Sequence, residues 1–455
     1  MLRRLLFLLP VLAASAYAQS PAGDWQGAIE IGQPEPLQLI LRITEAGDSL
    51  AATLDVPAQG ATGLPASSAS ATDDSLVVEL AAFGIRFDLA IAPDSLSGTF
   101  TQGPNALPIV MTSAEPLRRP QTPTGPFPYA TEEVTVESEP GVTLAGTFVL
   151  PEGDGPFPTV VFLSGSGPQD RDEEIAGHRP FAVLADALAR EGIASLRADD
   201  RGVGRSTGDF GASTVDTHLA DARALVAAVR QRGDVASVGV LGHSEGGLTA
   251  LRVTDDVDFL VTLAGPTRAF QEIYPVQLQR AVELAGIDSS AAALYRGAVE
   301  AALRPIAEAP DASDEVLAPL VDSAFNEALI DVPTAARMQM GLSGPAYPQV
   351  RASFVRSLVS PGLRSLLTYD PAAALESLDV PLLALYGGKD FQVPAEMNAD
   401  VLDGRDGVTV TIVADANHLF QTAETGALTE YGQIEETIAP ETLQMIVAWI
   451  AETAD

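Results

Sequence analysis

Up to about residue 113, the chain alternates short apolar runs with turn residues, and no stretch keeps a helical period beyond one turn. The apolar runs cover 37–43, 49–54, 76–80, 83–91 and 96–100, with Gly or Asp-Ser between them. Short strands separated by turns at this spacing are typical of a small antiparallel sandwich or meander. We therefore expect an all-β domain over residues 22–115. It contains no cluster of polar residues that would make it catalytic.

A proline-rich stretch follows, with prolines at positions 116, 120, 123, 126 and 128. Proline at this density favours the extended polyproline conformation and a semi-rigid spacer. The sequence therefore predicts a linker over 116–128 and a domain boundary within it.

From residue 129 the pattern changes to apolar runs that alternate with amphipathic segments. After an opening hairpin, strands are expected at 159–163, 193–197, 238–241 and 259–264, and helices at 181–190 and 215–232. This alternation indicates βαβ units and a mostly parallel sheet covered by helices on both faces. We assign residues 129–455 to this α/β domain.

The alternation stops at about 269–367, where the composition is helical and prolines break the helices. Apolar strand patterns return at 382–386 and 408–413, and a helix is expected at 440–451. An insertion between two strands of such a sheet usually lies over the sheet. We therefore expect a helical cap at about 269–367.

The first 18 residues have the pattern of a removable signal peptide. Arg3 and Arg4 precede an apolar stretch at 5–12, and a small-x-small cleavage signal occupies 16–18. The apolar stretch is too short to span a bilayer, and no later run reaches about 20 apolar residues. We expect an exported protein, periplasmic or extracellular, without a membrane anchor.

Composition removes several classes of function. The chain has 61 acidic and 26 basic residues, a formal net charge of −35, which disfavours nucleic acids and anionic membrane surfaces as partners. It has no cysteine, so disulfides, thiolate metal sites and cysteine-linked lipid anchors are excluded. A saline habitat would fit this acidity. A GC-rich genome would also favour Arg over Lys, and the sequence leaves the two explanations open.

The most informative stretch is Gly-His-Ser-Glu-Gly at 242–246, which follows the predicted strand 238–241 and precedes a helix-compatible segment. This is the context of a G-x-S-x-G nucleophile elbow. The glycines are needed because side chains at Gly242 or Gly246 would collide with the neighbouring strand and helix. The sequence therefore predicts an α/β-hydrolase fold with a helical cap and a small N-terminal all-β domain, and Ser244 as its nucleophile.

A serine nucleophile needs a histidine base and a carboxylate that orients the histidine. In this fold the chain order is serine, acid, histidine. Of the four histidines, only His418 lies beyond the elbow, directly after the last predicted strand. Asp390 follows the strand before it. We predict a triad of Ser244, Asp390 and His418, with Asp400 and Asp403 as weaker substitutes for the acid.

Acyl transfer also needs donors for the developing oxyanion, each worth about 3–4 kcal/mol of the barrier. The elbow supplies the backbone N–H of Glu245. The loop at 164–172 contains Gly165 and Gly167, which let the backbone approach a substrate, and both are candidates for the pocket. We assign the second donor to the Ser166 N–H, with Gly167 as the alternative. A plain glycine turn is the competing interpretation.

The remaining histidines receive smaller roles. His178 is a candidate for the substrate pocket, His218 is expected on a helix surface, and His243 is expected to pack under the strand. No histidine–carboxylate spacing suggests a catalytic metal. The Gly-x-Gly at 202–204 lacks the third glycine of a dinucleotide site, so no cofactor is expected.

Charged residues at the strand ends are expected to brace the site. Asp170, Arg171 and Asp172 are expected to pin the oxyanion loop by charge-assisted hydrogen bonds. Asp200 and Arg201 are expected to form an ion pair or a bracing loop. Direct contact with substrate is the alternative for both groups.

Together these segments resemble a known family. The runs at 164–172, 200–206, 242–247 and 387–394 look like bacterial α/β-hydrolases of the EstD-type serine carboxylesterase group. The resemblance extends from about residue 129 to the C-terminus. The Trp-x-Gly opening at Trp25 and the run at 98–102 are similar to the β domain often found ahead of such hydrolases.

The resemblance implies hydrolysis of short-chain carboxylic esters through Ser244, Asp390 and His418. Members lack the His-Gly of lipase-type oxyanion loops, and this chain has Ser164 in that place. Natural substrates, oligomeric state and the role of the β domain are not implied.

We therefore expect an exported serine esterase that acts on a small-molecule ester through an acyl-enzyme intermediate. A serine peptidase or aminopeptidase of the same fold is the alternative. An aminopeptidase would need paired carboxylates for the substrate ammonium, and Glu245 with acids of the cap could serve. A non-catalytic binding protein is a third interpretation, which the complete triad disfavours.

Overall fold

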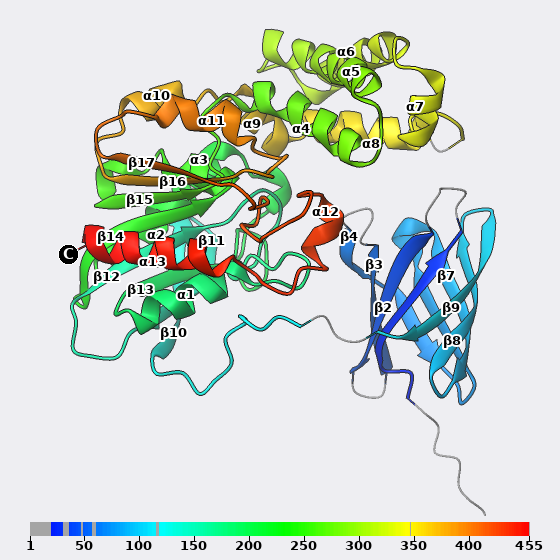
Figure 1. The fold of residues 1–455 in the computed structure, drawn as a ribbon, viewed down its shortest axis with the longest axis horizontal. Helices are drawn as coiled ribbons and strands as arrows, with labels where there is room; N and C mark the ends of the chain where they lie inside the picture. Colours follow the sequence, from blue (N-terminus) through cyan, green and yellow to red (C-terminus); the bar gives the residue numbers. More distant parts are fainter. Residues whose placement is uncertain are drawn as a thin grey trace, which may run out of the picture. The chain divides into compact units, whose positions relative to one another are not determined.

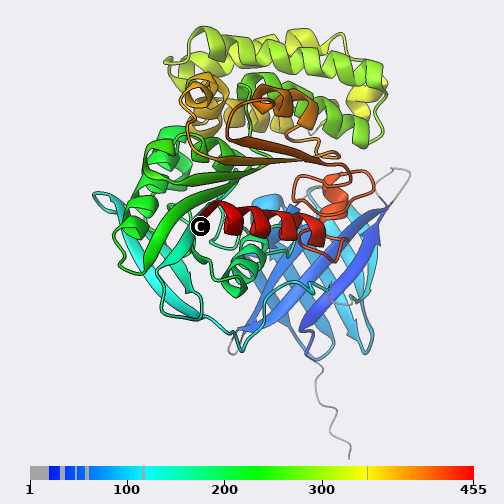
Figure 2. The same cartoon turned by 60° about the vertical axis from the view of Figure 1, so that its left-hand side comes forward.

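In the computed structural model, the described residues are 20–30, 36–46, 49–56, 61–114, 118–345 and 347–454. The predicted signal peptide over 1–18 lies outside them. The chain divides into two compact units, Met1–Leu117 and Arg118–Asp455, and each is described by itself. Figure 1 and Figure 2 show the first unit in blue and the second from cyan to red.

The first unit is a nine-stranded sheet in the order β4-β3-β2-β1-β9-β8-β7-β6-β5, with every pairing antiparallel. Its strands are β1 (Gly23–Ile29), β2 (Leu37–Ala46), β3 (Ser49–Val56), β4 (Ala61–Pro65), β5 (Ser68–Ala71), β6 (Ser75–Leu80), β7 (Ile85–Ala92), β8 (Ser95–Gln102) and β9 (Asn105–Ser113). The predicted all-β domain is confirmed.

Buried and half-buried residues alternate along the strands, which explains why the sheet has one face on a core. In β6, Leu76, Val78 and Leu80 are fully buried, whereas the residues between them are half-buried. Successive side chains of a strand point to opposite faces, so one face faces a core. Phe87 and Phe100 meet edge to face in that core, with ring centroids 5.3 Å apart.

The second unit is built on an eight-stranded sheet in the order β10-β11-β13-β12-β14-β15-β16-β17. The strands are β10 (Ala130–Glu139), β11 (Val142–Leu150), β12 (Phe157–Leu163), β13 (Ala194–Ala198), β14 (Val235–His243), β15 (Phe259–Leu263), β16 (Leu382–Gly387) and β17 (Val408–Val413). β10, β11 and β13 pair antiparallel, and every pairing from β13 through β12 to β17 is parallel.

The central strands are covered on both faces. Every residue of β15 and of β16 is buried, which a strand with one solvated face does not allow. The helices packed on this sheet are α1 (Pro180–Arg190), α2 (Val215–Arg230), α3 (Glu245–Ala250), α11 (Ala395–Leu402) and α13 (Pro440–Ala454). The predicted doubly covered, mostly parallel sheet is therefore confirmed.

Between β15 and β16 the chain forms the predicted helical cap. Its helices are α4 (Phe270–Leu284), α5 (Ser289–Glu308), α6 (Asp314–Leu329), α7 (Thr334–Gln339), α8 (Tyr347–Val359) and α9 (Pro361–Thr368), and α10 (Ala372–Glu376) leads back to the sheet. The cap has its own core, in which Leu317, Phe325 and Leu358 are fully buried. Figure 1 shows these green-to-yellow helices gathered beyond the β15–β17 side of the sheet.

The segment that opens the second unit is not a free spacer. Arg119 donates hydrogen bonds to the carbonyl oxygens of Ala176 and Gly432, at 2.9 Å each. Gln121 donates to the carbonyl of Ile438 at 2.7 Å. This part of the expected linker is therefore fastened to the hydrolase unit.

Candidate active site

Ser244 lies where β14 ends and α3 begins, and its backbone is strained, with φ 53° and ψ −118°. Such positive φ values are unfavourable for side-chain-bearing residues and persist only where the surroundings enforce them. A Cβ at Gly242 would lie 2.1 Å from the Gly246 oxygen, and a Cβ at Gly246 would lie 2.1 Å from the Leu163 oxygen. The two glycines therefore allow the sharp turn, as the motif predicts.

Asp390 and His418 meet at the ends of the next two strands. Asp390 follows β16 and His418 follows β17, and both side chains are buried. His418 Nδ1 lies 2.7 Å from Asp390 Oδ2. Because an ionised carboxylate only accepts hydrogen bonds, Nδ1 is the donor, and the neutral ring held in this way has its lone pair on Nε2. This is the tautomer that a general base requires.

The loop that carries His418 is held by its own side chains. Asn417 Oδ1 accepts hydrogen bonds from the amides of Leu419 and Gln421, at 3.0 Å each. The Asn417 amide donates to Gln421 Oε1 at 2.8 Å. The loop brings the His418 ring to the elbow, where its centroid lies 4.7 Å from that of His243.

The loop after β12 lies against Ser244. A Cβ built on Gly165 would lie 3.3 Å from the Ser244 Cβ, so only glycine fits comfortably at this position. The N–H of Gly165 is donated to Glu173 Oε1 at 2.6 Å. Ser166, next in the loop, is exposed. The backbone N–H of Glu245 begins α3 on the other side of Ser244.

Arg171 and Asp172 fasten this loop to the strand beside it, as predicted. Arg171 Nε and Nη2 donate to the two oxygens of Asp199 at 3.0 and 2.8 Å, and Asp172 pairs with Arg197. Although burial disfavours its charged form, Asp199 has a lowered pKa because Arg171 and the amide of Arg205 donate to it. A bidentate, charge-assisted pair of this kind fixes the orientation of the two side chains and also stabilises their contact.

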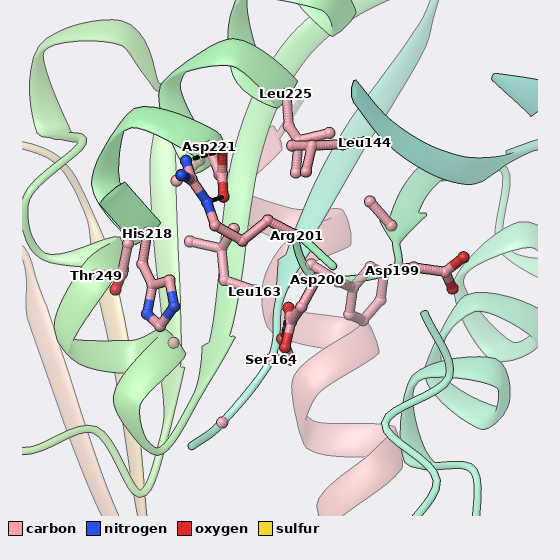
Figure 3. A pocket seen from close by; sticks show the side chains of 15 residues that line it. Leu144, Leu163, Ser164, Asp199, Asp200, Arg201, His218, Asp221, Leu225 and Thr249 are labelled. Carbon is pink, nitrogen blue, oxygen red and sulfur yellow. Dashed lines mark hydrogen bonds and ion pairs between the residues drawn. The ribbon is translucent and has the colours of Figure 1, made fainter. Parts of the chain in front are cut away.

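Asp200 and Arg201 are adjacent but do not pair with each other (Figure 3). Asp200 accepts hydrogen bonds from the Ser164 hydroxyl at 2.6 Å and from the Gln169 amide at 2.9 Å, so it braces the oxyanion loop. Arg201 instead donates two hydrogen bonds of 2.7 Å to Asp221. Burial raises the pKa of Asp200 to about 7.

Behind the oxyanion loop is a small cavity of about 50 Å³, large enough for a few water molecules. Its lining includes Ser164, Gly165, Asp200, His218 and Gly246 (Figure 3).

Two histidines have surroundings that the sequence does not indicate. His178, a candidate for the substrate pocket, is fully buried, with Nδ1 3.0 Å from Thr437 Oγ1 and Nε2 2.8 Å from the Tyr431 oxygen. Burial lowers the pKa of His178 to about 4, so the ring is neutral at physiological pH. His218 was expected on a helix surface, but its Nδ1 lies 3.0 Å from the Glu245 carboxylate.

The described residues were also compared with the requirements of a metal site and of a membrane-spanning helix. Within the described residues, no group of three or more His, Asp or Glu side chains is arranged to hold a metal ion. No helix among these residues is both long and apolar enough to cross a bilayer.

Comparison with known proteins adds a family match and a relative. The family model described as "Serine aminopeptidase, S33" matches residues 178–284. The Esterase EstD of Thermotoga maritima is 27% identical over 305 residues, which are 66% of this chain and 62% of that protein. The match thus spans about three fifths of the length of this curated relative.

Matches among solved structures include two esterases. The Pyrococcus furiosus esterase Pf2001 matches 71% of this chain and 93% of its own, at 16% identity and a TM-score of 0.42. Est1E from Butyrivibrio proteoclasticus with bound ferulic acid matches 70% of this chain and 96% of its own, at 17% identity and a TM-score of 0.40. The strand order and the sharp turn at Ser244 are those of an α/β-hydrolase fold, and the chain is similar to the Esterase EstD of Thermotoga maritima.

Proposed function

We propose that this protein is a serine esterase that cleaves short-chain carboxylic esters through an acyl-enzyme, with Ser244, His418 and Asp390 as its triad. The observation that carries the proposal is the buried Asp390–His418 pair, 2.7 Å apart, on the loop that reaches the elbow of Ser244. The EstD relative, itself named an esterase, supports it.

In the first step, Ser244 Oγ attacks the ester carbonyl carbon and His418 Nε2 takes the hydroxyl proton. Asp390 stabilises the imidazolium that forms. The amides of Glu245 and Ser166 donate to the oxyanion of the tetrahedral intermediate. The C–O bond to the alcohol then breaks, and His418 returns its proton to the leaving alcohol.

In the second step, water replaces the alcohol. His418 takes a proton from the water as it attacks the acyl carbon, and the proton passes to Ser244 Oγ when the acyl–enzyme bond breaks. A carboxylic acid leaves, and the enzyme returns to its starting state. The cap helices, inserted between β15 and β16, are proposed to bound the acyl or alcohol pocket.

The family model described as a serine aminopeptidase keeps a peptidase as the second candidate. An aminopeptidase needs carboxylates that are free to meet a substrate ammonium. Near the elbow, however, the Glu245 carboxylate already faces His218, and Asp200 already accepts from Ser164 and Gln169. These engagements favour the esterase. A purely binding role is disfavoured by the intact Asp390–His418 geometry.

The test is release of p-nitrophenol from acetate, butyrate and decanoate esters by the mature protein and by Ser244→Ala. Ser237→Ala is the matched control, since Ser237 lies at the other end of β14 and bonds the Ala454 oxygen. Fast turnover of short esters that only Ser244→Ala abolishes supports the proposal. A fully active Ser244→Ala, or cleavage of aminoacyl anilides alone, overturns it.

We also propose that residues 1–18 direct export and are then removed. The basic start, the apolar stretch and the small-x-small site support this. Fractionation of the source cells, with the N-terminus of the mature protein sequenced, tests it. A cytoplasmic protein that retains Met1 contradicts the proposal.

A further inference from the structure

Glu173 is buried directly beneath the candidate active site, with 1% of its surface exposed. Its backbone has a positive φ of 53°, an unfavourable conformation for a residue with a side chain. Its Oε1 accepts the Gly165 N–H at 2.6 Å and lies 2.8 Å from His243 Nδ1. One carboxylate oxygen thus joins the oxyanion loop to the elbow.

His243 continues this connection to a third segment. Its Nε2 lies 3.0 Å from the backbone oxygen of His418. Both neighbours of the ring, a carboxylate and a carbonyl, accept hydrogen bonds, so both ring nitrogens must donate. A histidine with two ring protons is an imidazolium, and its charge is balanced here by Glu173.

We propose that Glu173 and His243 are a buried positioning pair that holds the oxyanion loop, the nucleophile elbow and the His418 loop in one arrangement, with His243 as an imidazolium. These three segments follow β12, β14 and β17, and no sequence motif links them. The inference rests on the proposed function of Ser244 and His418 for its catalytic consequence, but the contacts themselves do not depend on it.

The electrostatic surroundings agree with the geometry. Although burial favours neutral His243, the adjacent Glu173 carboxylate, the His418 carbonyl and the charge of Asp390 raise the pKa of His243. The charged groups that face it are therefore Glu173 and Asp390, with the His418 ring 4.7 Å away. Without Glu173, a positive charge on His243 would oppose formation of the His418 imidazolium during each acyl step.

The first test observes the wild-type protein by NMR and uses one variant for signal assignment. The untagged chain contains four histidines, so a ¹⁵N-histidine label gives few ring signals, and His243→Gln assigns the one that belongs to His243. We expect His243 to keep both ring protons at pH 8, well above the ordinary histidine pKa of about 6.5. A singly protonated His243 at pH 8 overturns the imidazolium assignment.

The second test compares Glu173→Gln with Glu174→Gln. Glu174 is the next residue, is exposed and pairs with Arg179, so its variant removes the same charge without touching Gly165 or His243. A phosphonate that labels Ser244 counts intact sites, so that kcat is expressed per reactive serine. We expect Glu173→Gln to lower kcat about 10- to 100-fold with little change in KM, since small displacements cost the transition state most.

The double variant Glu173→Gln/His243→Gln completes the cycle. If the two residues act as a unit, it loses about as much kcat as either single variant, because the second change removes nothing further. A Glu173→Gln enzyme with normal kcat per site, or losses that multiply in the double variant, overturns the positioning role.

The two proposals fail in different ways. If wild-type protein neither cleaves esters nor reacts with the phosphonate, the proposed esterase function fails. The NMR arm still decides the state of His243 in that case. If the protein cleaves esters but His243 is neutral, the proposed esterase function holds and the proposed pairing of Glu173 with a His243 imidazolium is wrong.

Discussion

Asp390 uses its two carboxylate oxygens for different partners: Oδ2 lies 2.7 Å from His418 Nδ1, whereas Oδ1 accepts the amides of Gln392 and Val393 at 2.7 and 3.0 Å. The backbone therefore fixes the rotation of the carboxylate before any substrate binds. An acid held in this way selects one tautomer of the histidine.

Asp390→Asn should therefore lower kcat by about 10³- to 10⁴-fold, because an amide can present its NH₂ to Nδ1 and stabilise the wrong tautomer. Steady-state hydrolysis of p-nitrophenyl butyrate measures the loss. Asp400→Asn is the control, since Asp400 is an exposed aspartate that pairs with Arg268. A similar loss in both variants would mean that Asp390 is not the acid of the triad.

Gly246→Ala should abolish hydrolysis and lower the melting temperature, because its Cβ would lie 2.1 Å from a backbone oxygen that cannot move freely. The matched control is Gly297→Ala in the middle of α5, where a Cβ meets nothing within 4 Å. That variant should stabilise the helix by about 0.5–1 kcal/mol. Thermal melts and ester turnover of both variants check these two expectations. An active and stable Gly246→Ala would contradict the first.

Asp200 should make stability depend on pH. Burial raises its pKa to about 7 from an ordinary value near 3.8, so the folded state binds more protons than the unfolded state between these values. The contribution of Asp200 to the free energy of unfolding therefore falls as pH rises from about 4 to about 7.

Urea unfolding at pH 5 and pH 8 tests this. Asp200→Asn should gain stability relative to wild type as pH rises, since asparagine does not titrate. His178, whose pKa is lowered to about 4, acts in the opposite direction but is common to both proteins. An unchanged difference between the two proteins at the two pH values would contradict the shift of Asp200.

Arg201→Ala should destabilise the hydrolase unit by about 3–5 kcal/mol, because it leaves the Asp221 carboxylate without its bidentate partner. The Arg201 side chain is 7% exposed, whereas that of Arg205, paired with Glu133, is 70% exposed. Arg205→Ala should therefore cost at most about 1 kcal/mol. Denaturant midpoints of the two variants provide the comparison, and equal midpoints would refute it.

The sheet, the cap, the turn at Ser244 and the pairing of Asp390 with His418 could be predicted because their signals are local. A run of buried residues predicts a central strand, and a glycine-flanked serine at its end predicts the elbow. Asp390 and His418 each follow a strand, so parallel pairing brings them to one edge of the sheet. Chain order then assigned them as acid and base.

The residues that the sequence did not reveal depend on contacts between distant segments. Glu173 belongs to no motif, and only the fold brings it to His243 and Gly165. His218 was placed at the surface because its helix period gives no sign of the Glu245 carboxylate from α3. Asp200 and Arg201 are neighbours in the chain, yet their side chains serve different partners.

The cap also has a consequence for how this chain could change. Leu260 of β15 and Leu382 of β16 pair in register, although residues 264–381 lie between the two strands. The entropy lost on closing such an excursion grows only with the logarithm of its length, about 0.6 kcal/mol for each doubling. Insertions and deletions there are therefore inexpensive for the sheet, so the cap can vary in length while the strand ends that carry Asp390 and His418 stay in place.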